Sequence, residues 1–157
     1  MRSVEKVGTR VTREEWRTEM SCLTMDMCQE MMNWIINTVK DDGGKPVAIS
    51  ICDQGGSVVA LIKMDGVPAR SAHLAQHKAY TAARMQTTTE SFMARLNREN
   101  LEITFFCDPK LTPFPGGSPI IADNGSVIGA VGISGRTSEE DQCLASYAAS
   151  MHCPATC

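Results

Sequence analysis

Aromatic residues and excess positive charge are both scarce in this chain of 157 residues. Aromatic side chains make up 5% of it, and 15 Lys and Arg stand against 18 Asp and Glu, which gives a formal net charge of −3. No block of basic residues compensates locally, although a protein that binds the phosphate backbone needs one. The composition therefore argues against nucleic acid as a partner.

Long apolar runs are also missing. No stretch approaches the roughly 18 apolar residues of a membrane-spanning helix, and the first residues lack the apolar core of a signal peptide. The seven cysteines are an odd number, and no two have C-x-x-C spacing, so we expect reduced thiols. These absences predict a cytoplasmic protein without a membrane partner.

An ordinary apolar content of 43% and a length of 157 residues predict one globular domain. We divide the chain into an N-terminal arm (1–23), the domain (24–151) and a short tail (152–157). In the arm, Thr12 and Glu15 have the spacing of a capping box, and Trp16 and Met20 follow four residues apart. This pattern predicts a short amphipathic helix in the arm.

Helical periodicity, capping boxes and turn residues divide the domain into secondary-structure elements. The predicted helices span 24–42, 70–84, 87–97 and 137–151. The predicted strands span 47–52, 57–63, 101–107, 119–123 and 126–134. The order is helix, hairpin, two helices, strands and helix, without regular βαβ alternation. It predicts an α+β fold with a five-stranded antiparallel sheet and helices packed on it.

The predicted strand 126–134 is non-polar on both of its alternating faces. Neither face would be stable against water. Helices can cover one side of so small a sheet, and either a second subunit or the terminal helices must cover the other. From this we expect a homo-oligomer.

Two histidines supply the clearest candidate for ligand chemistry. His73 and His77 are four residues apart on a predicted helix, so both imidazoles share a face and could hold a metal or flank a flat ligand. The spacing is equally typical of two solvated or hydrogen-bonded histidines. Cys52 and Cys107 could act as thiolate ligands or nucleophiles, or could simply be small apolar residues.

Other motifs give weaker signals for catalysis. Glu139, Glu140 and Asp141 fall in the first turn of a predicted helix, where capping and the helix dipole explain carboxylates. Gly116 and Gly117 match neither a phosphate-binding loop nor a dinucleotide fingerprint. No nucleophile, base and oxyanion hole come together by spacing. The residues alone indicate a small-ligand-binding or oligomer-forming domain.

Four motifs in order resemble the GlcG/HbpS-like family of haem-binding proteins, which includes the C-terminal domain of PduO-type corrinoid adenosyltransferases. They are Asp53-Gln-Gly-Gly56 with Met64-Asp-Gly66, Lys78-Ala-Tyr80-Thr-Ala82, Gly116-Gly117-x-Pro-Ile120, and Gly129-Ala-Val-Gly132-Ile-Ser-Gly135 with Glu139-x-Asp141. The resemblance covers residues 23 to about 150. It implies an antiparallel five-stranded sheet, oligomeric assembly, and haem or another tetrapyrrole as ligand.

The resemblance also directs attention to particular site residues. It implies a cofactor site drawn from His77, His73, Lys78, Tyr80, Asp53, Gly116 and Gly117. His77 or His73 would be the ligand of the haem iron, and Lys78 could pair with a propionate unless it serves the opposite helix face. The chain departs from the family at the two histidine positions, where members often carry Asp and then Asn or Asp. Adenosyltransferase activity is not transferred, because it belongs to a separate domain.

Three functional hypotheses follow. The first is a non-catalytic, oligomeric accessory protein that binds haem or a related tetrapyrrole and is linked to a catabolic pathway of the glycolate or diol type. The second is an interaction or cargo protein of a bacterial microcompartment, docking on a shell protein or pathway enzyme through its N-terminal arm. The third is a small enzyme of the same pathway, with a pocket around Asp53, Lys78 and Gly116-Gly117.

Overall fold

The computed structural model describes residues 22–152 of the chain, so the predicted helix with Trp16 and Met20 lies outside the described residues. Four α-helices, four strands and one short 3-10 helix follow one another in the described part. They are α2 (Met25–Asp41), β1 (Ala48–Asp53), β2 (Val58–Lys63), α3 (Ala69–Met85), α4 (Thr89–Glu99), η1 (Ile103–Phe106), β3 (Gly117–Ile121), β4 (Val127–Ser134) and α5 (Ser138–Ser150).

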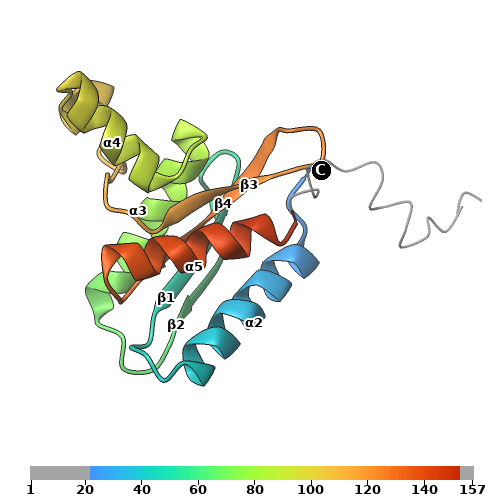
Figure 1. Ribbon diagram of the computed structural model, residues 1–157. Coiled ribbons are helices and arrows are strands. Elements are labelled where there is room, and N and C mark those ends of the chain that lie inside the picture. The colour runs from blue at the N-terminus through green and yellow to red at the C-terminus, as the bar shows by residue number, and fades with distance from the viewer. Residues whose placement is uncertain (1–21, 153–157) are drawn as a thin grey trace, which may run out of the picture.

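The strands form one antiparallel sheet in the order β2-β1-β4-β3 (Figure 1). The fold is α+β, and the sheet has four strands rather than the predicted five. The segment predicted as a strand over 101–107 contains η1 instead. Asn100 and Cys107 bracket it with φ values of 51° and 53°, which no extended strand can include. Phe106 then packs edge-on against Phe92, with 5.4 Å between ring centroids.

Helix α3 packs on one face of the sheet because both surfaces carry small side chains. Ala75, Ala79 and Ala82 on the helix are fully buried. A Cβ on Gly132 of β4 would collide with the carbonyl oxygen of Ala75 and the backbone nitrogen of Ala79. The alanine-rich helix and the glycine together allow this close approach of α3 to the sheet.

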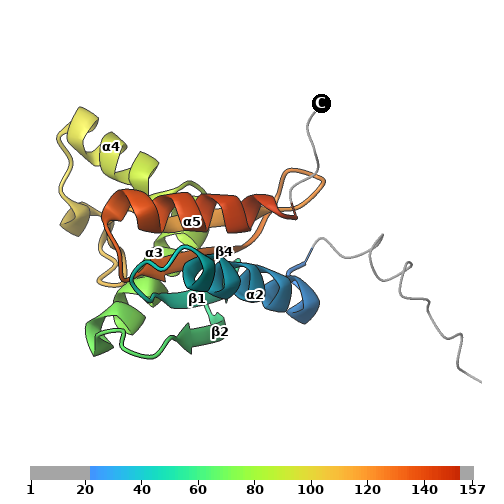
Figure 2. The same ribbon diagram turned by 60° about the horizontal axis from the view of Figure 1, so that its bottom comes forward.

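Helices α2 and α5 cover the opposite face, as the two views show (Figures 1 and 2). The main core lies there, where branched side chains of the sheet meet residues of the two helices. It includes Met31 and Ile35 of α2, Ile49 of β1, Val131 of β4 and Ala145 of α5.

Strand β4 is therefore covered on both faces by helices of the same chain. All of its residues from Ile128 to Ser134 are buried. The apolar character of this strand, from which we expected a homo-oligomer, is thus satisfied without a second subunit. The homo-oligomer stays a prediction, and this strand does not support it.

Hydroxyl side chains begin three of the helices. Thr24 caps α2 through Met27 N, and Thr137 forms the predicted capping box of α5 with Glu140. Helix α4 begins one residue later than its predicted box, with Thr88 as the cap accepting from the backbone of Ser91. These caps explain why short helices start where they do.

The described part of the chain contains five free cysteines, namely Cys22, Cys28, Cys52, Cys107 and Cys143. Within residues 22–152, none of the helices combines the length and the apolar composition needed to cross a bilayer.

Candidate functional site

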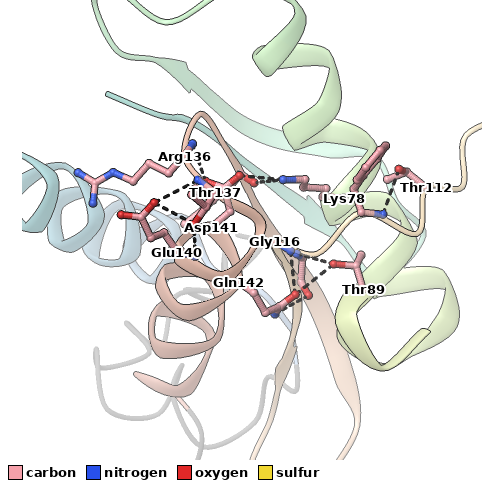
Figure 3. Close-up of polar contacts among 12 residues, drawn as sticks. Lys78, Thr89, Thr112, Gly116, Arg136, Thr137, Glu140, Asp141 and Gln142 are labelled. Atoms are coloured by element: carbon pink, nitrogen blue, oxygen red, sulfur yellow. Dashed lines mark hydrogen bonds and ion pairs between the residues drawn. The ribbon is translucent and has the colours of Figure 1, made fainter. Parts of the chain in front are cut away.

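Lys78 and Asp141 form a buried ion pair between α3 and α5 (Figure 3). Lys78 Nζ donates to Asp141 Oδ2 and to the carbonyl oxygen of Ile133, each at 2.9 Å, and both charged side chains are only 3% exposed. The other carboxylate oxygen of Asp141 accepts from the backbone nitrogen of Arg136 at 3.1 Å. The pair therefore links α3, β4 and the start of α5.

Burial shapes the protonation of both groups. Loss of solvent lowers the pKa of Lys78 and raises the pKa of Asp141, while their mutual attraction and hydrogen bond act in the opposite direction on each. Because each charge has its partners inside the protein, the pair acts as a structural clamp and not as an accessible acid and base.

Gly116, which precedes β3, and Gly117, which begins it, lie next to this clamp. Gly116 N donates to Gln142 Oε1 at 2.8 Å, and Gly117 N donates to Thr89 Oγ1 at the same distance (Figure 3). A Cβ on Gly117 would collide with the carbonyl oxygen of Lys78. The predicted cofactor-binding glycines thus sit in a buried hydrogen-bond network, where only glycine allows the loop to approach α3 so closely.

The outward face of α3 carries a different set of side chains. Arg70, His73, His77 and Arg84 fall within one third of the helix circumference at 100° per residue, roughly opposite Ala79. His77 is half-buried, and the other three are exposed. Two imidazoles are therefore flanked along the helix by a guanidinium on each side.

A loop runs beside the turn of α3 that carries His77. Thr112 N donates to Thr81 Oγ1 at 2.9 Å, and that hydroxyl donates to the carbonyl oxygen of His77 at 2.8 Å. Further along, Gly116 is held next to Lys78. Phe114 lies between these two anchored points, and it is 54% exposed. The loop that carries this exposed aromatic side chain is therefore anchored beside the turn of α3 that contains His77.

Tyr80 and Asp53 stand at the far end of α3, near the turn between β1 and β2. The Tyr80 hydroxyl donates to Asp108 Oδ2 at 2.7 Å, a bond that lowers the pKa of Asp108 and raises that of Tyr80. Asp53 Oδ1 accepts from the backbone nitrogens of Gly55 and Ser57, both at 2.9 Å. Asp53 thus closes the turn, and Tyr80 fastens α3 to the loop after η1.

The predicted site residues therefore separate into distinct places. His73 and His77 share one helix face, whereas Lys78 lies about 100° around α3 from His77 and is turned into the protein toward Asp141, so it is not beside them as a partner for a propionate. Asp53 pairs with Gly129 in the sheet, and Lys78 contacts Ile133, four residues further along β4. That separation is roughly 13 Å at 3.3 Å per residue. The structure thus does not bring Asp53, Lys78 and the two glycines into one catalytic pocket.

Of the two candidate thiolate ligands, Cys52 and Cys107, the structure disfavours Cys52. Cys52 is buried, and desolvation raises the pKa of its thiol to about 12, so the thiolate is strongly disfavoured. Cys107 is exposed. Among residues 22–152, no three His, Cys, Asp or Glu side chains group closely enough to hold a bare metal ion.

Sequence reasoning missed several residues of these sites. From the sequence, Asp141 was explained by helix capping. In the structure, Thr137 and Glu140 form the capping box that starts α5, and Asp141, the next residue, lies on the buried side of this helix. Arg70 and Arg84 could have been found from their helical spacing to the two histidines. Phe114 had no comparable signal, because only the folded loop places it near α3.

Residues 23–150 match the family profile described as haem degrading protein HbpS-like. The chain is 35% identical over 111 residues to protein GlcG of Escherichia coli strain K12, covering 69% of this chain and 81% of that protein. It is 36% identical over 107 residues to an uncharacterised 15.0 kDa protein from the dhaT-dhaS intergenic region of Citrobacter freundii, covering 66% and 73%.

Solved structures share the fold. Protein ORFY of Klebsiella pneumoniae superposes with a TM-score of 0.73 at 26% identity, covering 85% of this chain and 92% of that one. A PduOC:haem complex superposes with a TM-score of 0.72 at 25% identity, covering 82% and 94%. A double mutant of Streptomyces reticuli HbpS, at 22% identity, has a TM-score of 0.75 and covers 96% and 98%.

Proposed function

Because the chain belongs to the HbpS-like family, we propose that it binds haem or a related tetrapyrrole on the outward face of α3. The observation that supports this proposal is the row of Arg70, His73, His77 and Arg84 along that face. An imidazole can ligate haem iron directly, and the porphyrin supplies four further nitrogens. A single histidine is therefore enough, and a cluster of three protein ligands is not needed.

The remaining groups on this face suit the rest of such a ligand. Its two carboxylates leave one edge of the ring, so they would find a guanidinium in whichever direction that edge points: Arg70 and Arg84 each lie seven residues from His77, or about 10 Å along the helix axis. Its apolar ring needs a non-polar wall. The half-buried Leu74 lies about 60° from His77 around α3, and the exposed Phe114 lies in the loop that Thr112 anchors to Thr81 of the same helix. His77 is therefore the preferred axial ligand, and His73 is the alternative.

The proposal is tested by titrating the purified protein with haemin and following the Soret band. The wild type should give a sharp shifted band at one haemin per site. His77→Ala should shift the band again or weaken binding at least tenfold, and His73→Ala should have the smaller effect. The matched control is His152→Ala, which removes the third histidine. The Nε2 atom of His152 lies 3.5 Å from Oε2 of Glu30 on α2, away from α3.

Unchanged spectra in both single variants and in the double variant would remove α3 from the haem hypothesis. Cys107 and Met64 would then be the next ligands to test. Binding that is lost equally in the His152→Ala control would indicate damage to the fold and not loss of a ligand.

We propose that the protein holds the tetrapyrrole without chemical turnover. This is favoured because the buried base of α3, Lys78, and the buried acid that contacts it, Asp141, are bonded to each other and to the backbone. The experiment adds ascorbate in air to the haemin complex. A Soret band that decays no faster than in the His77→Ala variant supports binding alone, whereas faster bleaching with iron release indicates degradation.

The roles in a glycolate or diol pathway and in a microcompartment stay predictions from the family resemblance. The docking helix of the cargo hypothesis, with Trp16 and Met20, lies outside the described residues. Deleting residues 1–20 should leave the melting temperature nearly unchanged while abolishing co-purification with a shell protein or pathway enzyme.

A further inference from the structure

A cavity of about 340 Å³ lies at one end of the sheet, beside the turn between β1 and β2. Its volume falls at the lower end of the range for small-molecule sites, which is roughly 300–1,000 Å³. Apolar walls with a few polar groups are the usual composition of such sites. The apolar walls here are Leu23, Val59 and Ile128, and the polar side chains are Cys22, Asp53 and Gln54.

The cavity lies on the face of the sheet that α2 covers, away from the outward face of α3. Ile128 belongs to the main core on that face, and Leu23 packs against the core just before α2 begins. A Cβ on Gly129, which pairs with Asp53 in the sheet, would lie 3.0 Å from Leu23 Cδ2. Glycine at this position therefore lets the chain before α2 close one side of the cavity.

A β-bulge in β2 supplies another wall. Ile51 pairs with Ala60 and Cys52 pairs with Val58, so Val59 has no partner on β1. Bulges re-aim a side chain and are frequent next to functional sites. Val59 is 49% exposed and lines the cavity. The bulge therefore sets an apolar side chain beside the polar groups of the turn.

The turn holds the carboxylate of Asp53 in a fixed position. Asp53 Oδ1 accepts from the backbone nitrogens of Gly55 and Ser57, both at 2.9 Å. The backbone nitrogen of Asp53 donates to the carbonyl oxygen of Ser57, and its own carbonyl oxygen accepts from Gly56 N. Within residues 22–152, Asp53 Oδ2 accepts no hydrogen bond. One carboxylate oxygen is thus oriented in advance for a ligand, which lowers the cost of binding.

The charge of the lining favours a positive ligand. Asp53 carries the one formal charge among the lining residues, and none of them is Lys, Arg or His. An anion would find no counter-charge there, and a bare metal ion would find a single carboxylate. An ammonium group can donate charge-assisted hydrogen bonds to Asp53 Oδ2 and to the amide oxygen of Gln54. An alkyl chain attached to it would pack against the apolar walls.

We propose that this cavity binds a small primary alkylammonium ion, with its ammonium group at Asp53 and its alkyl chain against Leu23, Val59 and Ile128. The ligand is distinct from the tetrapyrrole, and the inference does not depend on haem binding. The exposed thiol of Cys22 lines the same cavity, so a group attached to this thiol competes with the ligand for space.

Butylammonium chloride is the probe, added without haemin and at constant ionic strength to the isotopically labelled full chain. Amide NMR signals of Gln54, Gly55 and Val59 should shift saturably, and 1-butanol and sodium butyrate should bind at least tenfold more weakly. Asp53→Asn should weaken butylammonium binding at least tenfold, because Asn keeps the oxygen that closes the turn but removes the charge. Asp65→Asn, on an exposed residue of the turn after β2, is the matched control and should leave binding unchanged.

Modification of Cys22 tests the position of the ligand without altering Asp53. N-ethylmaleimide alkylates exposed thiols, which include Cys22, Cys107 and Cys143. In the wild type, the adduct at Cys22 should abolish butylammonium binding. The Cys22→Ser variant, treated in the same way, should bind as before, because its adducts lie outside the cavity.

Several results would overturn the proposal. They are the absence of saturable shifts, shifts confined to other parts of the chain, equal affinity for 1-butanol, and undiminished affinity in Asp53→Asn or in the alkylated wild type. Circular dichroism shows whether Asp53→Asn keeps the fold. If it does not, the comparison of alkylated wild type with alkylated Cys22→Ser decides.

Discussion

Replacing Asp141 by Asn should destabilise the protein strongly, because it leaves Lys78 buried without its counter-charge. The pair is joined at 2.9 Å with both side chains 3% exposed. The single amide oxygen of Asn can accept either from Lys78 Nζ or from the backbone nitrogen of Arg136, but not from both, and the negative charge is lost. Removing one member of such a buried pair costs about 3–5 kcal/mol in the free energy of unfolding.

The ability of Lys78 to lose its proton sets a ceiling on this cost. Neutralising a lysine whose ordinary pKa is 10.5 requires, at 1.36 kcal/mol per pH unit, about 4.8 kcal/mol at pH 7 and about 2 kcal/mol at pH 9. In the Asn variant the folded state binds fewer protons than the unfolded state, because the pKa of Lys78 falls further below that of the unfolded chain. Its stability therefore rises with pH, by up to about 1.4 kcal/mol per unit, until pH reaches the unfolded value.

Urea denaturation followed by far-ultraviolet circular dichroism at pH 7, 8 and 9 measures both effects. Glu139→Gln, which removes an exposed carboxylate from the same helix turn, is the matched control and should change stability by less than about 0.5 kcal/mol at each pH. A cost below about 1 kcal/mol at pH 7, or a cost that does not shrink toward pH 9, would refute the reasoning. Lys78→Met combined with Asp141→Leu should recover most of the loss.

Two further predictions address packing and acid stability. Gly132→Ala should cost about 1–3 kcal/mol in a urea titration, because the new methyl group collides with Ala75 and Ala79; a loss below about 0.5 kcal/mol would contradict the close approach of α3. The two terminal nitrogens of Arg136 donate to the two carboxylate oxygens of Asp42 at 2.6 and 2.8 Å, and these bonds lower the pKa of Asp42 from an ordinary 3.8 to about 2. The stability that the ion pair contributes is therefore present above pH 3.8 and is lost as pH falls through 2. Asp42→Asn should therefore lose less stability than the wild type between pH 4 and pH 2, and equal losses would show that the pairing does not matter in solution.

Local signals were enough to predict most elements of the fold. Gly43 adopts the left-handed conformation, with φ of 64°, directly after α2, and the turn beginning at Asp53 joins β1 to β2 as its composition predicts. The capping box at Thr137 starts α5 where it was expected. Each of these features depends on interactions within a few residues, which a sequence displays directly.

Elements that depend on distant contacts were less predictable. The segment 103–106 has strand-like composition, but Phe106 finds its packing partner on α4 and no neighbouring strand is available in the sheet order. The same holds for Asp141, whose partner lies 63 residues earlier in the chain. Local pattern explained a carboxylate there by capping, and only the packing of α5 against α3 reveals the ion pair.

The sequence by itself determined the α+β class, the helix that carries His73 and His77, and their common face, because helical spacing alone fixes which side chains share a side. Tertiary structure decided which other residues lie near that face and which lie elsewhere. It turned Lys78 inward to Asp141, set Asp53 at a distant turn and anchored the loop that carries Phe114 to Thr81 of α3. These outcomes depend on which elements pack together although they are far apart in the chain. Such long-range contacts produce no periodic pattern in the sequence.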